Sequence, residues 1–195
     1  MRKALFCVLM MLPLLCACGA PREKTAMDAA LEARSAYRAA AGLRARADVT
    51  ADYGRRVYTY TLGVSLTGGE TALTVLAPAE LFGMTARLNG EDGRLEYDGA
   101  VLETGPLPAS ELTPLGAVDA LWQAALDGFP DSGTFETVDD RPALRLLCRE
   151  PALEPGKGQE VTLWLDPDSY ALLRGEIALD GRRVIDCVFT EFTLQ

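Results

Sequence analysis

Few side chains of this 195-residue sequence could do chemistry, and most of them are cysteines and paired carboxylates. Histidine, the commonest general base and metal ligand, does not occur. Acidic residues are paired at three places: Glu91/Asp92, Asp139/Asp140 and Asp166/Asp168. Such pairs could serve a glycosidase or hold calcium. All three lie in segments typical of turns, where aspartate bonds its own backbone. We therefore expect solvated turns, with Asp166 capping its own.

The cysteines are five in number: Cys7, Cys16, Cys18, Cys148 and Cys187. The last two lie in apolar segments predicted to be strands, with no motif that would activate a thiolate. A disulfide between them is permitted in an exported protein. Two other predicted strands separate them, however, which places them about 14 Å apart at an inter-strand spacing of ~4.8 Å. We favour two buried thiols, with the disulfide as the alternative.

The N-terminal segment has the pattern of an export signal. Arg2 and Lys3 precede an apolar run at residues 4–15, which is too short to span a bilayer. The run ends in Leu15-Cys16-Ala17-Cys18, which resembles the lipobox of bacterial lipoproteins. The resemblance implies cleavage before Cys18 and attachment of a diacylglycerol to its thiol. Cys18 is preferred to Cys16 because a small residue precedes it. A plain secretory signal or an uncleaved anchor helix is the alternative.

These features predict a protein anchored by lipid to the extracytoplasmic face of the cell membrane. Residues 1–17 would be the signal peptide and residues 18–25 the lipidated cysteine with a short tether. Each buried methylene of an acyl chain adds roughly 0.8 kcal/mol to membrane binding. Removal of Arg2 and Lys3 lowers the formal charge from −9 by two, to −11. So acidic a chain does not fit a nucleic-acid partner or a broad electrostatic contact with anionic lipid.

Two predicted helices each precede a series of predicted strands. Thr25 and Asp28 form a capping-box pattern before an alanine-rich helix at residues 26–45. Thr113, Pro114 and Gly128 delimit a second helix with an apolar stripe. Alternating apolar residues and glycine turns predict the strands: 58–66, 71–77, 84–88, 94–97, 100–103, 134–138, 143–149, 160–165, 171–179 and 183–194.

About ten strands and two helices predict an α+β fold in a single domain at residues 26–195. Successive hairpins favour one curved antiparallel sheet, an open half-barrel, with both helices packed on its concave face.

This order of elements, with Trp164-Leu165-Asp166-Pro167 near the end, resembles the LolA/LolB-like family of lipoprotein and lipid carriers. The family includes mycobacterial glycolipid-transfer lipoproteins and germination-associated lipoproteins of spore formers. The resemblance implies an apolar hollow that holds acyl chains. Candidate lining residues are the predicted inward-facing set: Tyr58, Tyr60, Leu62, Leu73, Val75, Leu121, Trp122, Leu163, Leu165, Ile177 and Phe189. Ordinary core packing is the alternative for each of them.

Residues 78–84 carry Leu81 and Phe82 between two predicted strands. In the tethered receptor of the LolA/LolB-like family, an apolar tip at such a place touches membrane or cargo. We expect instead that the pair is buried under the first helix, because an exposed Leu-Phe pair would be unusual on a soluble domain.

The leading hypothesis is a non-enzymatic lipoprotein, without cofactor or metal, that binds a lipid or another apolar ligand in the half-barrel. The alternative is a tethered protein-interaction module that positions or stabilises a cell-envelope enzyme, as the germination-associated members of the family do. A large apolar hollow favours the first hypothesis. A filled core with an exposed apolar groove or sheet edge favours the second.

Replacing the lipidated cysteine tests the anchor. In Cys18→Ser we expect loss of lipid labelling, with the protein released from the membrane fraction or left as an unprocessed precursor, because a hydroxyl does not replace the thiol. Radiolabelled acyl incorporation and fractionation measure this. Normal processing with continued lipid labelling would contradict the lipobox assignment.

Overall fold

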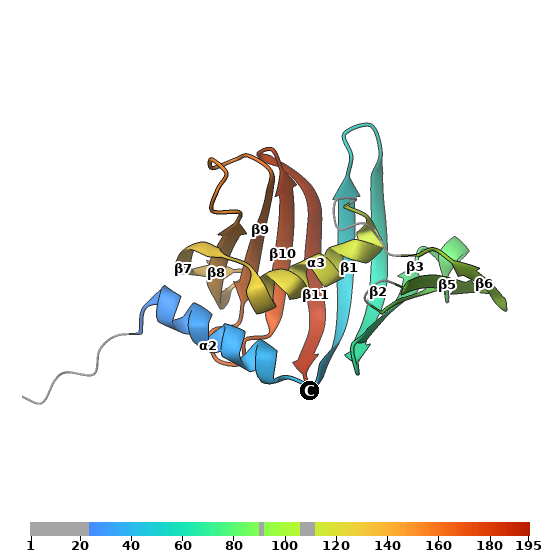
Figure 1. Cartoon of the computed structure of the whole chain (residues 1–195), viewed down its shortest axis with the longest axis horizontal. Coiled ribbons are helices and arrows are strands. Elements are labelled where there is room, and N and C mark those ends of the chain that lie inside the picture. Colours follow the sequence, from blue (N-terminus) through green and yellow to red (C-terminus); the bar gives the residue numbers. More distant parts are fainter. Residues whose placement is uncertain (1–23, 90–91, 106–111) are drawn as a thin grey trace, which may run out of the picture.

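The structure is a computed structural model that describes residues 24–89, 92–105 and 112–195. Within these ranges, eleven strands form one antiparallel sheet and two α-helices lie on its concave side (Figure 1). The predicted fold class, an α+β half-barrel with an open curved sheet, is therefore confirmed.

The first half of the chain contains α2 (Ala26–Ala39), β1 (Gly42–Asp52), β2 (Val57–Thr67), β3 (Glu70–Ala77), the short 3-10 helix η2 (Ala79–Leu81), β4 (Thr85–Asn89), β5 (Asp92–Tyr97) and β6 (Ala100–Glu103). The second half contains α3 (Pro114–Asp127), β7 (Pro130–Val138), β8 (Arg141–Arg149), β9 (Gln159–Leu165), β10 (Leu172–Leu179) and β11 (Arg182–Leu194). The order in the sheet is β6-β5-β4-β3-β2-β1-β11-β10-β9-β8-β7. Two meanders are thus joined through the β1–β11 pair.

Strand β1 was not predicted, because the first helix was expected to continue to Ala45. The helix ends at Ala39, and an eleven-residue strand begins at Gly42. The burial pattern alternates along this strand: Leu43, Ala45, Ala47, Val49 and Ala51 are buried, whereas Arg44, Arg46 and Asp48 are exposed. The alternation of buried and exposed residues along β1, together with its pairing to β2 and β11, outweighs the helix propensity of alanine and arginine.

Helix α2 has the predicted capping box. The Thr25 hydroxyl accepts a hydrogen bond from the Asp28 backbone N–H at 3.1 Å, and the Thr25 N–H donates to the Asp28 carboxylate at 3.2 Å. The buried face of α2 consists of three alanines and Tyr37. The Tyr37 hydroxyl donates to the Tyr170 carbonyl at 3.1 Å, and its ring centroid lies 5.1 Å from that of Trp122 on α3. Tyr37 therefore fixes α2 to both α3 and the turn between β9 and β10.

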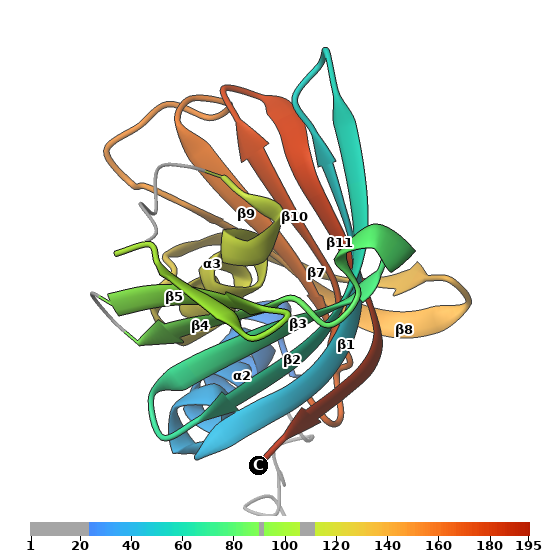
Figure 2. The same cartoon turned by 90° about the vertical axis from the view of Figure 1, so that its right-hand side faces the viewer.

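Helix α3 lies within the curve of the sheet (Figure 2) and packs against β1, β9, β10 and β11. Its N-cap is Thr113, whose hydroxyl accepts from the Gly116 N–H at 3.0 Å, as predicted. Leu121 is fully buried over Gly175 of β10. A Cβ atom at Gly175 would lie 2.5 Å from both terminal carbons of Leu121. The absence of a side chain at Gly175 thus lets α3 approach the sheet closely.

The two later cysteines are buried free thiols, as favoured from the sequence. Cys148 lies on β8 and Cys187 on β11, with β9 and β10 between them. Two intervening strands exclude a disulfide without rearrangement of the sheet.

The loop after β3 differs from expectation. Phe82 is 63% exposed, whereas Leu81 is half-buried and packs against the core. Helix α2 packs against β7 and β8, near the opposite edge of the sheet from β3, so it does not cover this loop. The prediction that both residues are buried under the first helix is therefore wrong for Phe82.

The predicted signal peptide and Cys18 lie outside the described residues, so lipidation stays a prediction. Neither α2 nor α3, nor any other helix in the described ranges, is long and apolar enough to cross a membrane.

The contact between Leu121 and Gly175 gives a stability prediction. Gly175→Ala should lower the free energy of unfolding by about 1–3 kcal/mol, because the added methyl overlaps a fully buried side chain. Gly63→Ala is the matched control in the same sheet, since a Cβ there would make an ordinary 3.6 Å contact with Leu76. Denaturant unfolding measures both variants. Equal stabilities for the two would contradict the close approach of α3.

Candidate functional site

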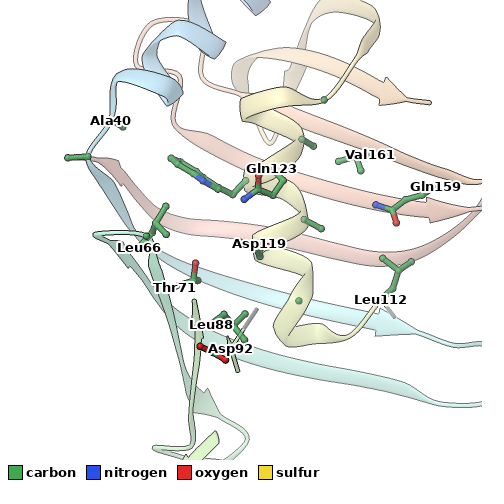
Figure 3. Close-up of a pocket in the computed structure, with 17 residues that line it drawn as sticks. Ala40, Leu66, Thr71, Leu88, Asp92, Leu112, Asp119, Gln123, Gln159 and Val161 are labelled. Carbon is green, nitrogen blue, oxygen red and sulfur yellow. The ribbon is translucent and has the colours of Figure 1, made fainter. Parts of the chain in front are cut away.

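A pocket of about 780 Å³ lies beside α3 (Figure 3). One wall comes from the strands, where Leu66, Thr71 and Leu88 are direct cross-strand neighbours on β2, β3 and β4. The sheet register therefore places these three side chains in one row on the concave face.

The opposite wall of the pocket is a face of α3. Gly116, Asp119, Ala120 and Gln123 all line it. Their spacing of three, four and seven residues places them on one side of a helix. This side differs from the one that carries Leu121 into the core, so α3 packs with one face and borders the pocket with another.

The lining combines apolar surface with a few polar groups, as is usual for ligand sites. Large apolar side chains come from every part of the wall: Leu66, Leu88, Leu112, Trp122 and Val161. Polar side chains also contribute: Thr71, Asp92, Asp119, Gln123 and Gln159. This composition can bind an amphiphilic molecule.

Asp119 is the pocket carboxylate with a perturbed pKa. Desolvation by burial raises its pKa, and a hydrogen bond with Gln123 opposes that effect in part. No group of three or more histidine, cysteine, aspartate or glutamate side chains suitable for a metal ion occurs in the described ranges.

The acidic pairs behave largely as predicted. The Asp166 carboxylate accepts from the backbone N–H groups of Ser169 at 2.8 Å and Asp168 at 3.1 Å, and these bonds hold its pKa below the usual range. Asp139 and Asp140 are exposed turn residues with positive φ. Asp92 is exposed, as expected, but it begins β5 instead of lying in a turn, and it lines the pocket. Glu91 lies outside the described residues.

The predicted lining residues lie in three environments. Trp122 lines the pocket. Eight of the predicted lining residues are core residues that are at most 3% exposed: Leu62, Leu73, Val75, Leu121, Leu163, Leu165, Ile177 and Phe189. Tyr60 is half-buried against this core, and Tyr58 is 36% exposed with its ring 6.0 Å from that of Tyr53. Contact of these residues with a ligand stays a prediction.

Sequence reasoning did not identify Thr71, Asp119 or Gln123 as pocket residues. The position of Asp119 and Gln123 could have been predicted, because they lie four residues apart in the second predicted helix and outside its apolar stripe. Thr71 gave no such signal, because the pattern of a strand does not reveal whether its inward side chains meet a helix or an open space.

No family model matches the sequence, and no curated protein matches it either. Solved structures are similar in fold. An uncharacterized conserved protein from Thermus thermophilus has 12% identity and a TM-score of 0.50, with 88% of each chain covered. A LolA superfamily protein from Nitrosomonas europaea has 14% identity and a TM-score of 0.43, over 88% of this chain and 94% of that one.

A third similar chain belongs to the complex of the CwlD amidase from Clostridioides difficile with the GerS lipoprotein. It has 14% identity and a TM-score of 0.48, over 90% of this chain and 99% of that one. These similar structures thus include a LolA superfamily protein and a chain of a complex that contains a lipoprotein. At such identities the likeness concerns the fold alone.

The buried thiols give a prediction about reactivity and pH. Burial raises the pKa of Cys148 to about 11 and raises that of Cys187 as well. Cys148 and Cys187 are the only cysteines of the sequence after Cys18. A protein of residues 19–195 should therefore not react with Ellman's reagent when it is native, and it should show two reactive thiols when it is unfolded. A native thiol that reacts at the rate of the unfolded chain would contradict this burial.

The same pKa shifts affect stability. Each thiol has a higher pKa in the folded than in the unfolded chain, so its contribution is fully present below about pH 8.5. It is lost as the pH rises further, because only the unfolded chain then releases these protons. The free energy of unfolding should therefore fall between about pH 9 and pH 11.

Proposed function

We propose that this protein is a membrane-tethered, extracytoplasmic lipoprotein that binds an apolar or amphiphilic ligand in the pocket beside α3. The observation that carries the proposal is the pocket itself. Its volume of about 780 Å³ falls in the range of roughly 300–1,000 Å³ that is typical of small-molecule sites.

The position of the pocket supports a carrier or sensor role. The concave face of the sheet would be filled by core if α3 covered all of it. Instead α3 packs chiefly against β1 and β9–β11, and the row Leu66, Thr71 and Leu88 lines the pocket. Apolar surface that remains uncovered inside a half-barrel favours a ligand with an apolar body.

The tether belongs to the same proposal. The lipobox-like sequence before Cys18 supports acylation, and seven residues lie between Cys18 and the start of α2 at Ala26. The eight Cα–Cα steps from Cys18 to Ala26 span at most about 29 Å. The domain would then work close to the membrane surface, where apolar ligands are available.

A second candidate function is a protein-interaction module, and the edge strand β6 favours it. All four residues of β6 are exposed, with Val101 at 60% and Leu102 at 63%. Unpaired backbone groups beside exposed apolar side chains are a surface that a partner strand can extend.

Filling the pocket tests the ligand-binding proposal. Ala120→Phe adds a ring on the α3 wall and should lower the affinity for the apolar dye Nile red by about tenfold or more. Ser35→Phe, which adds the same ring to the exposed face of α2, should leave binding unchanged. Fluorescence titration measures both variants.

Native mass spectrometry of residues 19–195 from an exporting host, with organic extraction, should identify the bound molecule. A stoichiometric lipid or other amphiphile that is absent from Ala120→Phe would support the proposal. A ligand-free mass and no dye binding would contradict it and favour the protein-interaction function.

A further inference from the structure

The charges that line the pocket are of one sign. Among the described residues, Asp92 and Asp119 are the charged members of its lining, and no lysine or arginine of those ranges joins them. Within the described residues, neither carboxylate has an ion-pair partner in the structure. An anionic headgroup would meet only repulsion at these two residues.

A second, independent feature is an unpartnered hydroxyl. Thr71 is 7% exposed and lines the pocket, and its side-chain hydroxyl makes no hydrogen bond with any described residue. Figure 3 shows its side chain projecting from β3 into the space between the strands and α3. The hydroxyl oxygen remains accessible from the pocket, so a ligand with a hydrogen-bonding group can reach it.

Polar groups lie on both walls of the pocket. Thr71, Leu88 and Asp92 lie on the strand wall, and Asp119 and Gln123 lie on the helix wall (Figure 3). Trp122 and Val161 add apolar surface elsewhere in the lining. A ligand with an apolar body and one donor-rich head therefore matches the site.

We propose that the ligand class is an amphiphile with a primary amine headgroup, whose ammonium group lies between Asp119 and Asp92 and donates to the Thr71 hydroxyl. This inference depends on the proposed binding function and names its chemistry. An ammonium group supplies three donors and a positive charge, which matches two carboxylates and a hydroxyl acceptor. A fatty acid has the wrong charge, and a long-chain alcohol lacks the charge altogether.

Three probes with the same ten-carbon chain test the headgroup: decylamine, 1-decanol and decanoate, titrated by calorimetry into the full mature domain at about pH 7.5. We expect decylamine to bind about tenfold or more tightly than decanoate, with 1-decanol between them. Equal binding of all three probes would overturn the headgroup inference and leave the pocket function intact. No binding of any probe would overturn the proposed function as well.

Matched variants exclude attraction to the acidic protein as a whole. Asp119→Asn and Glu150→Gln each remove one negative charge, but Glu150 is an exposed residue outside the pocket lining. Asp119→Asn should abolish most of the preference for decylamine over decanoate, and Glu150→Gln should retain it. Equal losses in the two variants would show nonspecific charge attraction and overturn the assignment.

A third variant tests the hydroxyl. Thr71→Val keeps the shape of the side chain and removes its polar group. It should weaken decylamine and 1-decanol binding several-fold while the apolar dye Nile red binds as before. Unchanged decylamine affinity in a folded Thr71→Val protein would remove Thr71 from the site.

Discussion

The pairing of β1 with β11 is the contact on which the rest of the structure depends. Strand β1 follows the first helix and β11 ends the chain, yet nine residue pairs between Leu43 and Ala51 of β1 and their partners on β11 join them. Because β1 also pairs with β2 along its whole length, it connects two meanders that would otherwise be separate sheets. Irregular register at Arg46/Ala47 in β1 and at Ile177/Ala178 in β10 adds local bends, and bulges of this kind increase twist and curvature.

Curvature creates a concave face that the helices cover unequally. Leu121 over Gly175 holds α3 against the floor formed by β9–β11 and β1. Helix α2, fixed through Tyr37, packs at the β7–β8 side. Both helices thus lie mainly over the C-terminal meander. The inner surface of β2–β5 is left facing the second side of α3, and the pocket forms between them.

The sequence predicts the strands well where apolar alternation is strong and glycine turns bound them, as at Gly68-Gly69. It fails at β1, because the small buried alanines of this strand are equally compatible with a helix, and at Phe82, whose burial depends on where α2 lies across the sheet. Trp122 was identified from its apolar stripe and does line the pocket, but Leu163 and Ile177, chosen by the same reasoning, are fully buried core. Whether an inward side chain meets protein or open space depends on the position of α3, and the distant strand contacts that set this position leave no sign in the local sequence.

The two candidate functions share one structural wall. Strands β3, β4 and β5 border the pocket on their inner face, and β6 extends the same meander to the exposed edge. On the outer face, Arg87 bridges Glu70 and Glu96 and thereby ties β3, β4 and β5 together. A ligand that packs against Leu88 and Thr71 would stabilise this wall, and so would a partner strand added to β6. Any coupling between occupancy of the pocket and pairing at the edge would be reciprocal, so that each would alter the affinity of the other by the same factor.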